Sequence, residues 1–101
     1  MTPHVCLYYG AALGRYGFPH GHPLGVDRQG AFFQEALARG LDRHAAIQAP
    51  QSAGRAQIER FHTREYVELV LRAEQDGREY LDYGDTPVFP GVFEASATVV
   101  G

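Results

Sequence analysis

The order of secondary-structure signals along this chain predicts an α/β fold. Residues 5–9 form a short apolar and aromatic run that ends at Gly10, which indicates a buried strand of a parallel sheet. A helical pattern follows, then a second strand and two further helical patterns. Strands that alternate with helices are typical of α/β domains.

The first half of the chain is expected to carry a long loop, one helix and the second strand. Residues 10–23 are rich in glycine and contain two prolines, which indicates a loop of the length that often carries function. A helix is predicted from about Gly25 to Arg39, with Gly40 ending it. Its apolar face comprises Val26, Gly30, Phe33 and Leu37. The second strand covers residues 44–49.

Two consecutive helices are predicted after the second strand. Ser52 is a suitable N-cap for a short helix over residues 53–60, and Thr63 is one for a helix over residues 64–76. The longer helix is amphipathic, because its apolar residues recur at helical spacing: Tyr66, Leu69, Val70 and Ala73. Gly77 is its stop signal.

The last segment is an aromatic, proline-rich loop over residues 78–90, followed by a helix that Pro90 is suited to open. This helix continues through Val99 and has the pattern of one that is cut off partway. Two strands alone make a poor sheet. We therefore expect residues 1–101 to be one portion of a larger domain, truncated in the last helix, or a unit that pairs with another copy.

Composition and charge exclude several classes of function. The chain has 101 residues, a net charge of −3, no lysine and no basic stripe, so it is not expected to bind nucleic acid. Cys6 is the only cysteine, which fits a reducing compartment, and it is expected to be a core residue. No signal peptide or membrane-length apolar stretch is visible. We predict a cytoplasmic protein without a membrane partner.

Two constellations could carry chemistry. The alternating pair His20 and His22 could chelate a metal if sequence-distant histidines joined it: His4, His44 or His62. Zinc requires three or four ligands, so packing within the loop is the favoured interpretation of this pair. Asp82 and Asp85 could form an acid/base pair, but an aspartate before Thr-Pro is more often a turn former.

Three blocks of residues nevertheless suggest a known family. They are His4–Tyr9 with Gly14, Tyr16, Gly21–Pro23 and Arg28; Pro50 with Phe61–His62 and Glu65–Val67; and Asp85–Phe89 with Gly91 and Phe93–Ala95. In this order they resemble the opening part of zinc-dependent histone deacetylases and acetoin-utilisation-type deacetylases. The resemblance implies a partial doubly wound, three-layer parallel sheet of the arginase/deacetylase type. It also implies a parent activity in which zinc-bound water hydrolyses an acetyl amide.

The resemblance implies roles for five residues. Asp85 resembles the rim aspartate that accepts hydrogen bonds from substrate backbone amides, and His22 and Pro23 resemble rim residues. Arg28 resembles the arginine of the channel through which acetate leaves, although a salt bridge on the helix surface is the plain alternative. Tyr9 resembles a residue of the deep pocket and channel, with core packing as its alternative. The family's zinc ligands and acid/base histidines lie outside the matching blocks.

The expected substrate is acetyl-lysine or a small acetylated amine. Gly25-Val26-Asp27 departs from the eukaryotic pattern and favours a bacterial relative over a histone-directed enzyme. We expect no deacetylase activity, and no metal or other cofactor, in this chain alone. The alternatives are a non-catalytic domain that homodimerises or binds a partner, and a small metal-binding protein. Exposed strand edges and the apolar end also predict a homo-oligomer.

Overall fold

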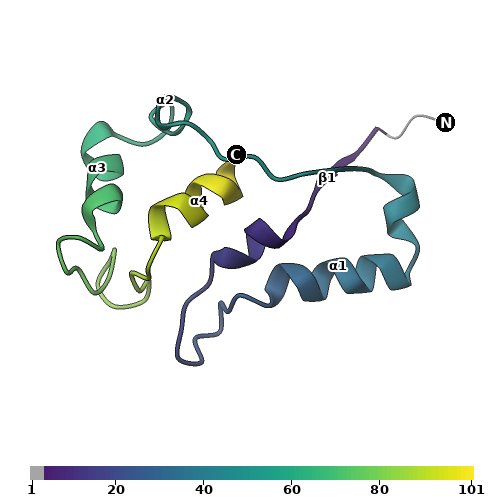
Figure 1. Cartoon of the computed structure of the whole chain (residues 1–101), viewed down its shortest axis with the longest axis horizontal. Coiled ribbons are helices and arrows are strands. Elements are labelled where there is room, and N and C mark those ends of the chain that lie inside the picture. Colours follow the sequence, from purple (N-terminus) through teal and green to yellow (C-terminus); the bar gives the residue numbers. More distant parts are fainter. Residues whose placement is uncertain (1–3) are drawn as a thin grey trace.

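The computed structural model describes residues 4–101, which form a thin, elongated molecule of 49 × 33 × 18 Å (Figure 1). Its elements in order are β1 (Cys6–Tyr8), the 3₁₀ helix η1 (Ala11–Arg15), α1 (Arg28–Ala38), the 3₁₀ helix η2 (Leu41–His44), β2 (Ala46–Gln48), α2 (Arg55–Ile58), α3 (Arg64–Arg72) and α4 (Val92–Val100). The predicted mixture of strands and helices is confirmed. In the part of the chain that is described, no helix has the length and apolar character that crossing a bilayer requires.

The two strands pair in parallel, as predicted, with Leu7 opposite Ile47. The prediction that the first strand is buried was wrong. Cys6, expected in the core, is exposed, and Tyr8 is 53% exposed. The physical reason is that α1, which connects the strands, packs mainly against η1 and η2 and leaves the short sheet largely uncovered.

Helix α1 begins at Arg28, three residues later than predicted, and ends before Gly40, whose φ of 70° matches its predicted role. The predicted apolar face is largely uncovered: Val26 is 57% exposed and Leu37 is 41% exposed. Phe33 does pack, because its ring stacks on that of Tyr9 with centroids 3.8 Å apart. The helix therefore buries a narrow stripe in place of a full apolar face.

The hydrophobic core lies in the other half of the molecule. Its buried members come from a loop, α3, the 78–90 segment and α4: Phe18, Val70, Phe89, Val92 and Ala95. Thr63 caps α3 as predicted, since its hydroxyl accepts a hydrogen bond from the Tyr66 amide at 3.2 Å. Val67, at 2% exposure the most enclosed side chain of α3, was not on the predicted face, whereas the predicted Tyr66 is 42% exposed.

Predicted boundaries of α2, α3 and α4 were wrong as well. Ser52 does not cap α2; Gly54 does, and the Ser52 hydroxyl instead lies 3.0 Å from the Thr98 hydroxyl of α4. Helix α3 ends at Arg72 rather than residue 76, although Gly77 adopts the positive φ of 71° expected at the turn that follows. Helix α4 begins at Val92 after Gly91, not at Pro90, because the positive φ of Gly91 (78°) turns the chain there.

Candidate functional site

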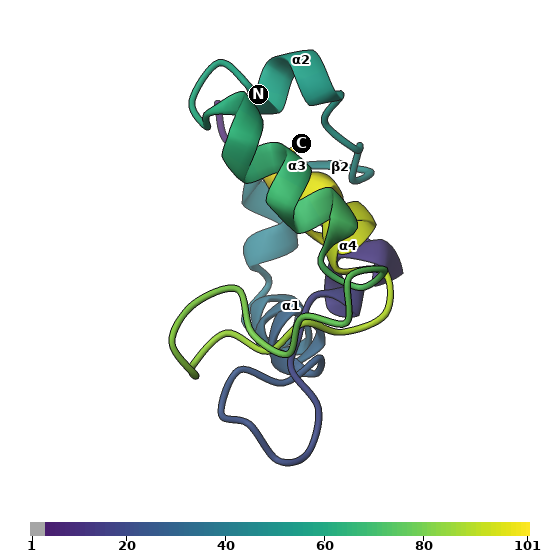
Figure 2. The same ribbon diagram turned by 90° about the vertical axis from the view of Figure 1, so that its left-hand side faces the viewer.

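Two loops that are far apart in the sequence meet at one end of the molecule. Figure 2 shows the loop around residue 20 and the 78–90 segment together, below α3. The contact joins His22 to Asp85, two of the residues predicted for the pocket rim: the His22 Nε2 atom lies 3.1 Å from the Asp85 carbonyl oxygen. The fold thus brings together side chains 63 positions apart, which no local pattern could have shown.

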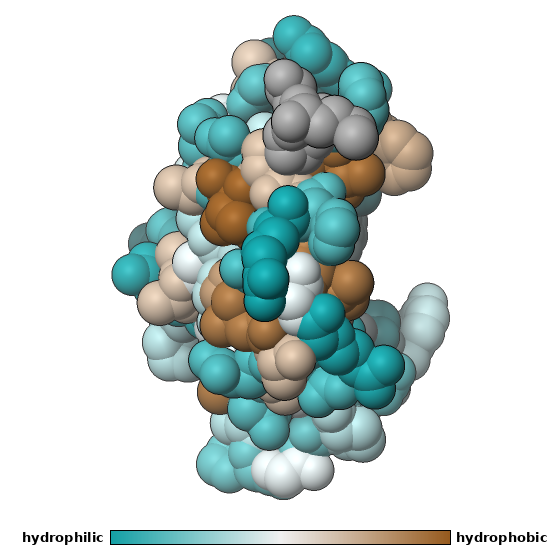
Figure 3. All heavy atoms as spheres, turned by 90° about the vertical axis from the view of Figure 1, so that its right-hand side faces the viewer, coloured by the Kyte–Doolittle hydropathy of each residue, from teal (hydrophilic) through white to brown (hydrophobic). Residues whose placement is uncertain are grey.

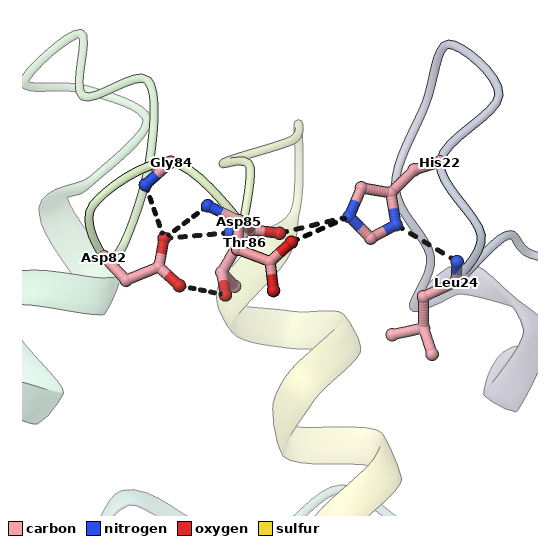
Figure 4. A network of polar contacts seen from close by, with 6 residues as sticks. All are labelled: His22, Leu24, Asp82, Gly84, Asp85 and Thr86. Carbon is pink, nitrogen blue, oxygen red and sulfur yellow. Dashed lines mark hydrogen bonds and ion pairs between the residues drawn. The ribbon is translucent and has the colours of Figure 1, made fainter.

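The ring of His22 is held at both nitrogens (Figure 4). Its Nδ1 accepts a hydrogen bond from the Leu24 amide at 3.1 Å. Because Nδ1 is an acceptor and the Asp85 carbonyl can only accept, Nε2 carries the proton and donates it. The ring also packs edge-on against Phe18, with centroids 4.7 Å apart. His22 therefore links the loop around residue 85 to a core aromatic residue.

The 78–90 segment is a hairpin whose tip carries Asp85. The Val88 amide donates to the Glu79 carbonyl and the Leu81 amide to the Thr86 carbonyl, each at 2.9 Å. At the tip the Asp85 side chain is 95% exposed, and one carboxylate oxygen lies 3.7 Å from His22 Nε2. An exposed carboxylate at a loop tip is free to accept hydrogen bonds from a ligand.

Asp82, not Asp85, forms the turn. Its Oδ1 accepts hydrogen bonds from the amides of Gly84, Asp85 and Thr86 at 3.1, 2.9 and 2.9 Å, and its Oδ2 accepts one from the Thr86 hydroxyl at 2.7 Å. These bonds, with that from the Thr86 hydroxyl as the largest contribution, hold the pKa of the Asp82 carboxyl far below its usual range. The prediction that the aspartate before Thr-Pro forms the turn was therefore wrong by three residues.

The other predicted site residues lie on or near α1. Pro23 is exposed next to His22, and Arg28 is exposed in the first turn of α1. Within residues 4–101 Arg28 forms no ion pair, so the salt-bridge alternative is not observed there, and its role in a product channel stays a prediction. Tyr9 stacks on Phe33, and a side-chain carbon added to Gly30 would lie 3.8 Å from the Tyr9 hydroxyl. The packing alternative for Tyr9 is thus observed, while its proposed role in a channel stays a prediction.

Histidine, cysteine and acidic side chains do not gather into a metal site in the described residues 4–101, where no three of them come together. The two ring nitrogens of His22 are already bonded to the chain itself. His62 packs against aromatic neighbours, Phe61 and Tyr66. The described side chains therefore do not fit a zinc ion.

An apolar cleft of about 210 Å³, not predicted from the sequence, lies between α3, α4 and the hairpin. It is lined by residues from five segments, among them Tyr16, His62, Tyr66, Thr86, Phe93 and Val100. Burial, and to a smaller extent the nearby Tyr66, raises the pKa of the Tyr16 phenol above its usual value. No sequence pattern signals this cleft, because its lining residues come together only in the folded chain.

The chain is similar to histone deacetylases of several animals. It is 33% identical to histone deacetylase HDAC1 of Drosophila melanogaster across 89% of this chain and 19% of the relative. It is 31% identical to probable histone deacetylase 1-B of Xenopus laevis and to histone deacetylase 1 of Homo sapiens, across 89% of this chain and 20% of each relative. The chain thus spans about a fifth of the length of the curated relatives it matches. No protein-family model matches it.

Proposed function

This chain belongs to the histone deacetylase superfamily, and we propose that it forms the substrate rim and part of the product channel of a zinc-dependent deacetylase. In this proposal residues 1–101 are one portion of a deacetylase domain with the arginase/deacetylase fold. The substrate is acetyl-lysine in a peptide or a small acetylated amine. In this proposal zinc and the acid/base groups belong to other parts of the complete enzyme.

The open architecture of the chain supports its assignment as a portion of a domain. Its radius of gyration is 15.7 Å, whereas a compact domain of about 100 residues has one of about 13 Å. Its sheet has two strands, and an independently stable sheet usually needs three or more. Additional strands beside β1 and β2, and helices over their faces, would complete a doubly wound sheet.

The observation that carries the proposal is the contact between His22 and Asp85. The resemblance assigned both residues to the rim, and the fold places them 3.1 Å apart through the Asp85 carbonyl. The Asp85 carbonyl is occupied by His22, so its exposed carboxylate is the part that faces outward. Two carboxylate oxygens at a rim can accept hydrogen bonds from successive backbone amides of a peptide.

Arg28 and Tyr9 form the second part of the proposal. Both belong to the same region, because Tyr9 stacks on α1 and Arg28 begins that helix. A guanidinium group attracts an anion and can donate two parallel hydrogen bonds to a carboxylate such as acetate. We assign Arg28 and Tyr9 to the path by which this product leaves.

The substrate assignment also reflects the segment that follows His22 and Pro23. The similar proteins of Drosophila melanogaster and Homo sapiens are eukaryotic and are named histone deacetylases. The Gly25-Val26-Asp27 stretch instead favours a bacterial type of enzyme, for which acetylated bacterial proteins or small amines are the proposed substrates. A cytoplasmic location is part of the same proposal.

The test replaces Asp85 in the protein translated from the complete reading frame that contains these residues. Asp85→Ala should lower kcat/KM for an acetyl-lysine peptide about tenfold or more, since a charge-assisted hydrogen bond contributes about 1.5–3 kcal/mol. Turnover of a small acetylated amine without backbone amides should change little. Asp76→Ala removes an exposed acid near the same hairpin and is the matched control. Equal kcat/KM values for wild type and Asp85→Ala on the peptide would contradict the role of Asp85.

A second candidate function is association with another copy or a partner through the sheet. The supporting observation is apolar exposure around β1 and β2: Val5 (61%), Tyr8 (53%), Leu41 (53%) and Ile47 (43%). Figure 3 faces this end of the molecule and shows apolar patches at its surface. Strand edges that carry such side chains tend to pair with other chains. In this candidate the chain acts as a homo-oligomeric or partner-binding domain without catalysis.

A further inference from the structure

The hairpin tip that carries Asp85 has little packing to hold it. Tyr83 is fully exposed, and Gly84 adopts a φ of 131°, a region that other residues rarely occupy. The side chain of Asp85 is 95% exposed. An exposed tip of this kind would move freely unless local hydrogen bonds fixed it.

Asp82 supplies four hydrogen bonds to the tip, and both of its carboxylate oxygens take part (Figure 4). Oδ1 gathers three consecutive backbone amides, which fixes the path of the chain from Gly84 to Thr86. Oδ2 accepts from the Thr86 hydroxyl, and the Thr86 carbonyl accepts a hydrogen bond from the Leu81 amide on the opposite arm of the hairpin. The side chain of Asp82 thus connects the tip to the hydrogen-bonded arms of the hairpin.

The direction of Asp85 follows from this arrangement. Its own amide is held by Asp82 at 2.9 Å, and its carbonyl accepts from His22 at 3.1 Å. With the groups on both sides of its Cα held, the backbone at Asp85 is fixed, and its side chain is 95% exposed with one carboxylate oxygen 3.7 Å from His22 Nε2. Asp82 holds the Asp85 amide directly, and by fixing the tip it also keeps the Asp85 carbonyl in reach of His22.

We propose that Asp82 is a positioning residue that fixes the hairpin tip so that Asp85 presents its carboxylate outward and its carbonyl to His22. This inference rests on the proposed function for the role of Asp85, because Asp82 acts on substrate only through that residue. The carboxylate of Asp82 is fully used within the hairpin. Its replacement should therefore weaken peptide binding through loss of order at residues 84–86.

The chain offers a graded set of variants. Asp82→Ala removes all four bonds, whereas Asp82→Asn keeps one oxygen for the backbone amides and an amide group that can donate to the Thr86 hydroxyl. Thr86→Val removes only the hydroxyl bond to Oδ2. Asp76→Ala is the matched control, because it removes an exposed acid outside the tip.

The first measurement is amide hydrogen exchange of residues 84–86, in the protein translated from the complete reading frame. Asp82→Ala should raise the exchange rate of these amides about tenfold or more. Asp82→Asn and Thr86→Val should raise it by less, and Asp76→Ala should leave it unchanged. Amides of α3 around Val67 should stay as in the wild type, which shows that the fold is retained. Exchange at residues 84–86 within twofold of wild type in Asp82→Ala would overturn the proposal.

The second measurement compares KM and kcat for an acetyl-lysine peptide. Asp82→Ala should raise KM to a similar degree as Asp85→Ala and leave kcat nearly unchanged, and the double variant should be no worse than Asp85→Ala alone. Additive effects of the two substitutions would overturn action through Asp85. If Asp85→Ala itself had no effect, the proposed function of the rim would fail, while hydrogen exchange would still decide whether Asp82 fixes the tip.

Discussion

The two halves of this molecule differ in how far they bury their apolar side chains. The half built on α3, α4 and the hairpin encloses apolar side chains, with Val67 and Val92 each 2% exposed. The half built on β1, α1 and β2 leaves comparable side chains in solvent, with Val5 61% and Phe32 60% exposed. The first half has a hydrophobic core, whereas the second half exposes its apolar side chains to solvent. This difference is why we propose that the sheet half is covered by further parts of the same protein or by a second copy.

The largest effect should come from placing a charge in the enclosed half. Val67→Asp should lower the free energy of unfolding by about 4 kcal/mol or more, because the carboxylate would lack both water and a partner. Val26→Asp, at a site 57% exposed, should change it by less than about 0.5 kcal/mol. Urea unfolding followed by circular dichroism measures both. If Val67→Asp does not fold, Val67→Ala should cost about 2 kcal/mol. If the Val26 and Val67 substitutions lowered the free energy of unfolding by similar amounts, the two halves would not differ in burial as described.

An intermediate effect is expected on self-association of the sheet half. A lysine at Ile47 of β2 would place a charge beside the strand edge and should weaken association of the chain about tenfold. Gln34→Lys adds the same charge to an exposed position of α1 and is the control. Sedimentation velocity over a range of concentrations gives the dissociation constants. A wild-type chain that stays monomeric at high concentration would count against association through the sheet.

The smallest effect concerns the pH dependence of the hairpin tip. Its hydrogen bonds lower the folded-state pKa of Asp82, below the value of about 3.9 for an unfolded chain. The ionised carboxylate therefore favours the folded turn at pH values above about 4, and this contribution is lost as the pH falls through the lowered pKa. Carboxyl carbon shifts of Asp82 in an NMR titration should show a midpoint below the ordinary value. A midpoint at or above that value would mean that the four hydrogen bonds do not favour the charged form.

Local signals predicted the parts of the fold that local physics controls. Thr63 caps α3, and Gly40 and Gly77 adopt the positive φ values expected where helices end. Burial was predicted poorly, because it depends on what covers a face: β1 has a core-like sequence but lies exposed, and Leu37 lies on the predicted apolar face but is 41% exposed. Ser52 had the chemistry of an N-cap, yet its hydroxyl is paired with Thr98 across the fold.

The candidate site was predicted in part, and only with help from the family resemblance. The resemblance singled out His22 and Asp85, and the structure brings them together. The turn-forming role of Asp82 was missed. Asp82 accepts hydrogen bonds from backbone amides two to four positions later. Asp85 is also an aspartate in this loop, so the sequence does not show which of the two forms the turn. The apolar cleft was also missed, since its lining comes from segments that meet only after folding.

We propose that these residues form the rim of a deacetylase and that other residues supply its reactive centre. The most direct measurement compares zinc-dependent turnover of an acetyl-lysine peptide by the 101-residue chain and by the product of the complete reading frame that contains it. We predict turnover by the complete product and none by the chain alone. Turnover by the purified 101-residue chain would contradict this account, as would an inactive product from a reading frame longer than the chain.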